Sequence, residues 1–253
     1  MSKSKGVVYL IGAGPGDPEL ITLKGVAKLG LADVVLYDRL VNSSILQHAP
    51  NHAEYILVGK QGYGPSTPQS DINQLLVKFA LSGKIVVRLK GGDVSFFSNI
   101  LDELEVLTEN NIAYEVIPGV TAASGCAAYT GIPLTARQLS DEVHILSIHN
   151  TCNYTTADWA YIAGLRGTIV LYMSASNLLK ITNELIAQHV DDRKLILIEQ
   201  GTLPNQKQYL SSLHQVNHDF ADKIFTSPAL VIIGAVVSLH EKFSWMAQNI
   251  EHS

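Results

Sequence analysis

Glycine, proline and ionisable residues gather directly after the β-branched stretches in the first half of the chain. The first such run combines glycines, prolines and an aspartate, and the later runs add an Asp-Arg pair, a Gly-Lys pair and a Lys-Gly-Gly-Asp turn. The five runs are residues 12–18, 38–40, 59–60, 90–93 and 118–122. Ligands of open α/β sheets bind where the carboxyl ends of the strands meet. The runs therefore predict one binding site at a single sheet edge.

The loop of residues 12–18, with the sequence GAGPGDP, favours a cationic ligand over a dinucleotide. A dinucleotide is the alternative ligand, because Asp38 lies roughly where a dinucleotide-binding fold would place its acidic residue. Pro15 and Pro18, however, lack the backbone N–H groups that would bind a pyrophosphate, and Asp17 adds negative charge beside the following helix. S-adenosylmethionine is a cation without phosphates and suits such a loop. A plain tight turn built by the glycines is the structural alternative.

Asp38 and Lys60 follow neighbouring predicted strands and form a candidate acid–base pair. A surface ion pair is an equal alternative on sequence alone. Gly91 and Gly92 lack Cβ atoms, so their backbone can approach a ligand closely, and Asp93 can accept a hydrogen bond from an amine or hydroxyl group. An aspartate that caps the next helix is the alternative for Asp93.

Arginines in or beside these runs are candidates for binding carboxylates. The guanidinium groups of Arg39, Arg88 and Arg137 can each bind a carboxylate through two hydrogen bonds. Solvated surface arginines are the alternative. We expect no metal site: His214 and His218 are four residues apart, as helical metal ligands can be, but no glutamate accompanies them.

The hydrophobic pattern of the first half predicts an α/β fold. Its β-branched stretches alternate with segments in which apolar residues recur at three- and four-residue spacing, which predicts a parallel sheet with helices on both faces. The predicted strands are residues 7–11, 34–37, 55–58, 85–89 and 114–117, and the predicted helices are residues 22–31, 71–82 and 99–110.

The second half of the chain has a different pattern. Strands are predicted at residues 143–148, 168–172, 195–199, 206–212 and 229–236, and a helix at residues 177–189. The stretch of residues 206–212 follows the preceding strand without a helix between them, which indicates a mixed sheet. We place the domain boundary near residue 137, with an N-terminal domain of residues 1–137, a C-terminal domain of residues 138–253, and the ligand between them.

Composition narrows the class of protein. Of 253 residues, 47% are hydrophobic and 16% are charged, and the net charge is −5. No basic tract is present, which argues against nucleic-acid binding, and no apolar run approaches the ~20 residues of a membrane span. The 2 cysteines follow neither a disulfide nor a metal-binding pattern. Since no apolar signal segment opens the sequence, we expect a cytoplasmic protein without a nucleic-acid or membrane partner.

Taken together and in order, these motifs resemble the tetrapyrrole (corrin/porphyrin) methylases over nearly the whole chain. The sequence VYLIGAGPGDPELITLKG at residues 8–25 is similar to the opening signature of that family. The sequences ADVVLYDRLV at 32–41 and VGK at 58–60 resemble its uroporphyrinogen-III C-methyltransferase branch in particular. The match continues through VVRLKGGD (86–93), PGVTA (118–122), GIPLT (131–135), IEQGT (198–202) and PALVIIG (228–234).

The resemblance implies an S-adenosylmethionine-dependent methyltransferase with two α/β domains, assembled as a homodimer, with the cofactor between the domains. The cofactor-binding residues that it implies by position are Pro15, Gly91, Gly92, Asp93, Phe96, Thr121, Ala122, Met173 and Gly201. Asp38 and Lys60 match the proton acceptor and proton donor proposed for the family. The implied reaction is C-methylation of a tetrapyrrole, uroporphyrinogen III, to precorrin-2 on the way to siroheme or cobalamin. Arg39, Arg88 and Arg137 would then bind the substrate carboxylates.

Three segments depart from the branch that the chain resembles. The branch reads GGDPFIFGRGGEE where this chain reads GGDVSFFSNILDE at residues 91–103. Residues 147–149 read Ser-Ile-His in place of Thr-Gly-His, and Ala136 stands in place of a histidine. Because these segments flank the substrate side, three alternatives stay open: a related enzyme with a different acceptor, a nucleotide-binding module, and a paralogue that binds the cofactor without catalysis.

Overall fold

The computed structural model describes residues 5–59 and 67–246. The chain folds into two compact units, Met1–Ala122 and Ala123–Ser253. The second unit thus begins earlier in the chain than residue 137, where the change in sequence pattern suggested a domain boundary. Each unit has one sheet and its own core.

The first unit has a five-stranded sheet whose strands are all parallel. The strands are β1 (Val7–Gly12), β2 (Val34–Tyr37), β3 (Glu54–Leu57), β4 (Val86–Lys90) and β5 (Ala113–Ile117). Their order in the sheet is β3-β2-β4-β1-β5. The predicted parallel sheet is confirmed, and each predicted strand lies within a few residues of its expected place. Since all strands run in one direction, their carboxyl ends share one edge of the sheet.

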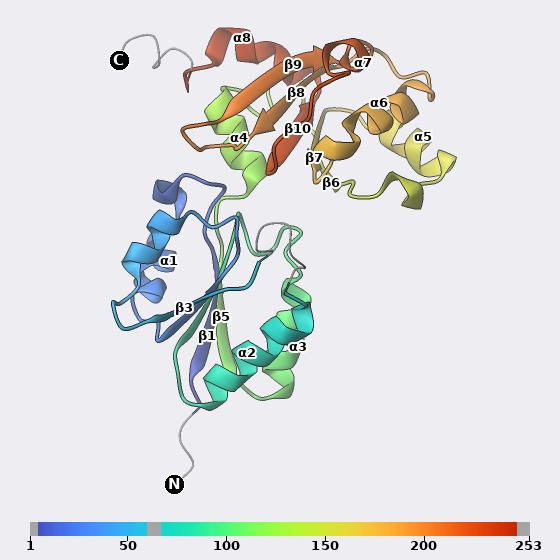
Figure 1. The fold of residues 1–253 in the computed structure, drawn as a ribbon. Coiled ribbons are helices and arrows are strands. Elements are labelled where there is room, and N and C mark those ends of the chain that lie inside the picture. Colours follow the sequence, from blue (N-terminus) through green and yellow to red (C-terminus); the bar gives the residue numbers. More distant parts are fainter. Residues whose placement is uncertain (1–4, 60–66, 247–253) are drawn as a thin grey trace. The chain divides into compact units, whose positions relative to one another are not determined.

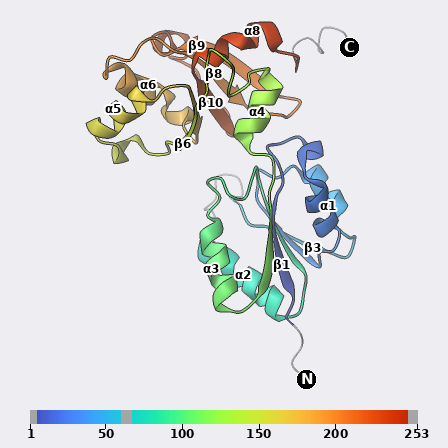
Figure 2. The same cartoon turned by 180° about the vertical axis from the view of Figure 1, so that it is seen from behind.

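Helices cover both faces of this first sheet. They are the 3₁₀ segments η1 (Pro18–Leu20) and η2 (Ser43–His48) and the α-helices α1 (Leu23–Leu29), α2 (Gln69–Leu81) and α3 (Ile100–Glu109). Helix α1 lies on one face of the sheet, and α2 and α3 lie on the other (Figures 1 and 2).

Alternation along the strands supplies both faces with core residues, because successive side chains of a strand point to opposite sides. Val35 packs with Leu29 of α1, whereas its neighbour Val34 packs with Leu76 of α2. These strands are apolar on both faces, as expected for a parallel sheet between two helical layers.

The second unit has a mixed five-stranded sheet. The strands are β6 (Val143–Ser147), β7 (Thr168–Tyr172), β8 (Lys194–Glu199), β9 (Lys207–Ser212) and β10 (Ala229–Ile233), in the order β6-β7-β10-β8-β9. Only the β6–β7 pair is parallel, and β10 runs antiparallel to both β7 and β8. The predicted mixed sheet is therefore confirmed. Strands β7 and β8 point the same way, so their carboxyl ends lie at the same edge.

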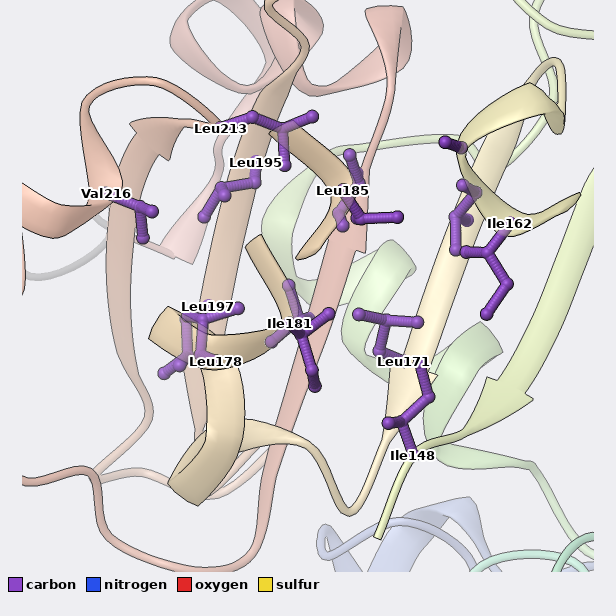
Figure 3. Close-up of a cluster of buried hydrophobic side chains, with 14 of the residues drawn as sticks. Ile148, Ile162, Leu171, Leu178, Ile181, Leu185, Leu195, Leu197, Leu213 and Val216 are labelled. Carbon is purple, nitrogen blue, oxygen red and sulfur yellow. The ribbon is translucent and has the colours of Figure 1, made fainter. Parts of the chain in front are cut away.

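The helices of the second unit enclose an apolar core. They are α4 (Ala122–Thr130), η3 (Thr151–Asn153), α5 (Thr156–Gly164), η4 (Ala175–Asn177), α6 (Leu178–Ile186), α7 (Val216–Asp219), η5 (Ala235–Leu239) and α8 (His240–Phe243). Figure 3 shows Ile162 of α5 and Ile181 of α6 packed with Leu171, Leu195 and Leu197 of the sheet. The sequence pattern predicted α6 but not α5, which begins at a capping box made by Thr155 and Asp158.

In the part of the chain that the structure describes, no helix is both long enough and apolar enough to cross a membrane.

Candidate active site

The loops after β1 and β4 form one hydrogen-bonded structure at the carboxyl edge of the first sheet. The Ala13 amide donates to the Lys90 carbonyl oxygen over 2.8 Å. One residue further on, Gly14 and Gly92 exchange two hydrogen bonds, with N···O distances of 3.1 and 2.7 Å. Two of the runs singled out by sequence are thus joined directly.

Close backbone approach explains the glycines in this edge. A Cβ atom on Gly12 would lie 2.6 Å from the Gly119 amide nitrogen, and a Cβ atom on Gly119 would overlap the Gly92 carbonyl oxygen. The loops after β1, β4 and β5 can therefore meet only without side chains at these positions.

Gly92 itself is different, because its missing side chain faces open space. Its φ is +70°, a conformation that L-residues rarely adopt, and apart from its two chain neighbours no described residue has an atom within 4 Å of its ideal Cβ position. The loop thus presents bare backbone on its open side. This geometry leaves room for the predicted contact of Gly92 with a cofactor, whereas a Cβ atom on Gly91 would lie 2.8 Å from Leu40 Cβ, so the contact of Gly91 stays a prediction.

Asp93 ties the loop after β4 to the loop after β5. One carboxylate oxygen accepts a hydrogen bond from the Gly119 amide at 2.8 Å, and the other accepts one from the Ser95 amide, also at 2.8 Å. Each oxygen keeps a second lone pair, so these bonds leave Asp93 able to accept a further donor. Its predicted contact with the cofactor stays a prediction.

Asp38 lies just beyond β2, at the same carboxyl edge, with 28% of its side chain exposed. Its carboxylate accepts a hydrogen bond from the guanidinium group of Arg88, with an N···O distance of 2.6 Å. The predicted partner Lys60 lies outside the described residues. The proposed pairing of Asp38 with Lys60 stays a prediction.

Arg88 belongs to a buried charged network beneath this edge. Its Nε donates to Glu103 Oε1 at 2.9 Å, and Lys90 Nζ donates to the same oxygen at 2.8 Å. All three side chains are at most 3% exposed. Burial, and secondarily the positive charge of Arg88, lowers the pKa of Lys90.

The environment of Arg88 differs from that of an arginine free to bind a substrate carboxylate. The sequence suggested that it binds a substrate carboxylate, but its guanidinium group already contacts the carboxylates of Asp38 and Glu103. Because the side chain is nearly fully buried, the geometry favours a role in holding Asp38 over direct contact with a ligand.

The Lys90 side chain and Glu103 were not among the residues predicted for the site. Two patterns carried the signal. Residues 86, 88 and 90 lie on the same face of β4, because successive side chains of a strand point to opposite faces. The cations Arg88 and Lys90 therefore both point toward the helices that cover this face. Glu103 and Leu107 are the buried residues of α3 and, being four apart, share the helix face that packs on the sheet. A buried cation requires such a carboxylate nearby.

The remaining predicted residues of the first unit lie along the same edge. Arg39 and Phe96 are exposed, and Pro15, Thr121 and Ala122 are half-buried. Arg39 follows the end of β2 at Tyr37, and Thr121 follows the end of β5 at Ile117. Their contacts with cofactor or substrate stay predictions.

Met173 and Gly201 lie in the second unit, just after β7 and β8, which end at one edge of its sheet. Met173 is 48% exposed and has a φ of +55°. Gly201 is buried, and a Cβ atom there would overlap the Cys126 sulfur atom. Burial raises the pKa of the Cys126 thiol to about 12, so this cysteine stays protonated and packs as an apolar side chain.

Arg137, the last predicted substrate ligand, lines a cavity in the second unit. The cavity has a volume of about 710 Å³ and is lined by residues 135–141 together with Arg166 and Gly167. Arg137 and Arg166 are both exposed to solvent. Two guanidinium groups and one carboxylate, that of Asp141, line the cavity, so its net charge is positive, as binding of a carboxylate would require.

The segment that departs from the expected pattern lies beside the loop after β4. Phe97 and Asn99 have φ values of 50° and 52°, and Phe96 packs edge-on against Phe97 with ring centroids 6.5 Å apart. Phe96, Phe97 and Leu101 are exposed by 38%, 47% and 63%. The segment therefore presents apolar surface close to the loop that carries Gly92.

Comparison with known proteins identifies the family. The sequence model of the Tetrapyrrole (Corrin/Porphyrin) Methylases matches residues 7–217. A siroheme synthase of Vesicomyosocius okutanii is 42% identical over 241 residues, which is 95% of this chain and 52% of that protein. The chain thus spans about half the length of the curated relatives it matches.

Solved structures agree with this assignment. The uroporphyrin-III C-methyltransferase of Thermus thermophilus, in complex with S-adenosylhomocysteine, is 36% identical with a TM-score of 0.78, covering 92% of this chain and 100% of that one. A cobalt precorrin-4 methyltransferase from cobalamin biosynthesis is 25% identical with a TM-score of 0.79, covering 91% and 95%. The chain therefore belongs to the tetrapyrrole (corrin/porphyrin) methylases, a family of methyltransferases that use S-adenosylmethionine as methyl donor.

Proposed function

We propose that this chain catalyses the S-adenosylmethionine-dependent C-methylation of uroporphyrinogen III to precorrin-2. The observation that carries the proposal is the position of Asp38: a partly exposed carboxylate, oriented by a buried arginine, at the sheet edge where the glycine loops meet. The similarity to a uroporphyrin-III C-methyltransferase over nearly the whole chain supports the choice of substrate.

The residues divide into three roles in this proposal. Asp38 accepts the proton that a pyrrole ring loses after methylation, and Lys60 serves as proton donor. Arg39 and Arg137 bind acidic side chains of the tetrapyrrole. The cofactor is held by Pro15, Gly91, Gly92, Asp93, Phe96, Thr121, Ala122, Met173 and Gly201.

The chemistry follows from these positions. When bound, S-adenosylmethionine supplies an electrophilic methyl group, which takes the electron pair of a ring carbon while sulfur leaves with its own bonding pair. The protein orients the ring carbon in line with that methyl group, and such orientation lowers the barrier substantially. Methylation leaves the ring positively charged, and Asp38 then accepts a proton that this ring system loses from a position other than the methylated carbon, which restores a neutral ring. Two such cycles on neighbouring rings give precorrin-2.

An anaerobic incubation of the purified protein with S-adenosylmethionine and uroporphyrinogen III tests the proposal. We expect mass spectrometry to detect the addition of two methyl groups. Asp38→Asn should lower turnover by about 100-fold or more, since a general base contributes 10²–10⁴-fold, while the affinity for S-adenosylhomocysteine stays unchanged. Asp71→Asn, at an exposed position in α2, is the matched control and should keep full turnover. Equal losses of turnover and cofactor affinity in Asp38→Asn would contradict its role as a base.

A different tetrapyrrole acceptor is the second candidate, and one observation favours it. Phe96, Phe97 and Leu101 expose apolar side chains in the segment where the sequence departs from the uroporphyrinogen branch. The family fold also serves a later corrin intermediate, since a cobalt precorrin-4 methyltransferase shares it. Binding of S-adenosylhomocysteine without methylation of uroporphyrinogen III would support this candidate.

We also propose that the chain forms a homodimer in the cytoplasm and has no nucleic-acid partner. The net charge of −5 supports the last point, because nucleic-acid binding depends on positive surface charge. Analytical ultracentrifugation of the purified chain would reveal the assembly, and a monomer at micromolar concentration would contradict it.

A further inference from the structure

The buried network under the active-site edge has an uneven arrangement around Glu103. Arg88 Nε and Lys90 Nζ both donate to one oxygen, Oε1, at 2.9 and 2.8 Å. The Gln69 amide nitrogen lies 3.5 Å from the same oxygen. The other oxygen, Oε2, is buried and has no hydrogen-bond partner among the described residues. The carboxylate is thus turned so that a single oxygen faces the cations of β4.

Stability is a poor explanation for such a network. Taking charged groups out of water is costly, and well-packed apolar side chains in place of a buried ion pair are often equally or more stable. Arg88, Lys90 and Glu103 are nevertheless all at most 3% exposed, on a sheet face otherwise covered by apolar residues. Buried ionisable groups with shifted pKa values cluster at functional sites, and burial lowers the pKa of Lys90.

On the side of the active-site edge, the network of described residues ends at the partly exposed Asp38. The Arg88 guanidinium is held on three sides: Nε donates to Glu103, one terminal nitrogen donates to the Leu89 carbonyl oxygen at 3.2 Å, and the other donates to Asp38 at 2.6 Å. A guanidinium group is a rigid plane, so fixing Nε fixes the direction of the terminal nitrogens. The orientation of the Asp38 carboxylate therefore depends on Glu103, which it does not touch.

We propose that Glu103 is a positioning residue for the proton acceptor Asp38, acting through Arg88. This inference rests on the proposed function, in which Asp38 removes a proton from the methylated ring. Without the negative charge of Glu103, the hydrogen bond to Arg88 Nε loses its charge assistance and holds the guanidinium less firmly, so Asp38 is no longer fixed in one orientation. A base that is misplaced by a fraction of an ångström transfers protons more slowly even though the cofactor still binds.

A double-mutant cycle between Glu103→Gln and Asp38→Asn tests the inference, with methyl transfer followed by mass in single turnovers. We expect Glu103→Gln alone to lower the rate by roughly 10- to 100-fold, with substrate KM and S-adenosylhomocysteine affinity unchanged. In the Asp38→Asn background the same change should cost less than about twofold, because a residue that acts through Asp38 has nothing left to position. Glu103→Asp, which keeps the charge, should restore part of the rate.

The controls separate this inference from the proposed function. Glu105→Gln, at an exposed position on the same helix, should leave the rate unchanged. If Glu103→Gln fails to fold, the double variant Lys90→Met with Glu103→Gln removes one buried charge of each sign and should show the same loss of rate. An equal loss in both backgrounds, or failure of both variants to fold, would assign Glu103 to structure and overturn the inference. No loss of rate in Asp38→Asn alone would instead overturn the proposed function.

Discussion

At the residue scale, glycine is required at the active-site edge for two different physical reasons. Gly12 and Gly119 allow backbone segments to pack against each other, and any side chain there would displace a neighbouring loop. Gly92 needs its positive φ, and its missing side chain faces open space instead of the protein. Only the second kind of glycine leaves backbone accessible to a ligand.

Alanine substitutions at Gly119 and at Gly92 should separate the effect of a glycine on packing from its effect on ligand binding. We expect Gly119→Ala to destabilise the fold by about 1–3 kcal/mol, since the new methyl group overlaps the Gly92 carbonyl oxygen. Gly92→Ala should cost about 1–2 kcal/mol for its positive φ and, in addition, weaken S-adenosylhomocysteine binding. Chemical denaturation and calorimetric titration measure the two effects. Undiminished affinity in Gly92→Ala would exclude this face of the loop from the cofactor site.

Lys90 makes stability depend on pH in the alkaline range. Burial lowers its pKa in the folded protein below the ordinary value of 10.5, so the unfolded chain binds more protons between the two values. The free energy of unfolding therefore increases with rising pH in that window. Lys90→Met removes this gain, so the stability of the variant relative to the native protein should fall as the pH rises through the alkaline range toward 10.5. Urea denaturation at several pH values measures the difference, and a constant or rising difference would be evidence against a buried, destabilised ammonium group.

At the element scale, the start of α3 decides where Glu103 lies. Asn99 precedes the helix with a φ of 52°, and its side chain makes no capping hydrogen bond. Two residues earlier Phe97 also has a positive φ, of 50°. Left-handed residues at both positions turn the chain sharply between the Gly92 loop and the helix, which then presents Glu103 and Leu107 to the sheet.

Substitutions at Asn99 should show how much this turn costs. Asn99→Gly should raise stability by several tenths of a kcal/mol, because glycine adopts positive φ without steric penalty. Asn99→Val should lower it by about 1–2 kcal/mol, since a β-branched residue strongly disfavours that conformation. Thermal unfolding of both variants provides the comparison. Equal stability of the valine and glycine variants would mean that the turn rearranges at low cost.

At the scale of the whole molecule, each compact unit has its own hydrophobic core. Two clusters fill the faces of the first sheet, and a third fills the second unit around the residues labelled in Figure 3. Helix α4 is tied to the second unit by the Ala123 amide, which donates to the Tyr172 hydroxyl, and by the Trp245 indole, which donates to the Ala128 carbonyl oxygen. These bonds explain why the second unit begins before residue 137.

Core truncations should act mainly within their own unit. Leu76→Ala and Ile181→Ala each remove a side chain that is fully buried, and each should cost about 2–5 kcal/mol. Hydrogen–deuterium exchange should accelerate mostly in residues 5–122 for the first variant and in residues 123–246 for the second. Equal acceleration across the whole chain in either variant would mean that the two units unfold as one.

The sequence by itself determined the strands, the direction of the first sheet and the edge where chemistry is expected. Those features depend on local patterns: β-branched stretches, alternation with helical periodicity, and glycine, proline or charged residues directly after the strands. Because parallel strands end at one edge, Asp38, Gly92 and Asp93 could be assigned to a common site from the order of residues alone.

Only the tertiary structure decided which partner each charged residue has. Arg88 looked like a ligand for a substrate carboxylate because nothing local says otherwise. Glu103 lies fifteen residues further along the chain, and it meets Arg88 only because α3 packs on the face of β4 to which residues 88 and 90 point. Which buried charges pair depends on how helices and strands pack against each other. The positions of strands and loops depend instead on residues that are neighbours in the chain. This difference sets the limit of what the sequence alone determined.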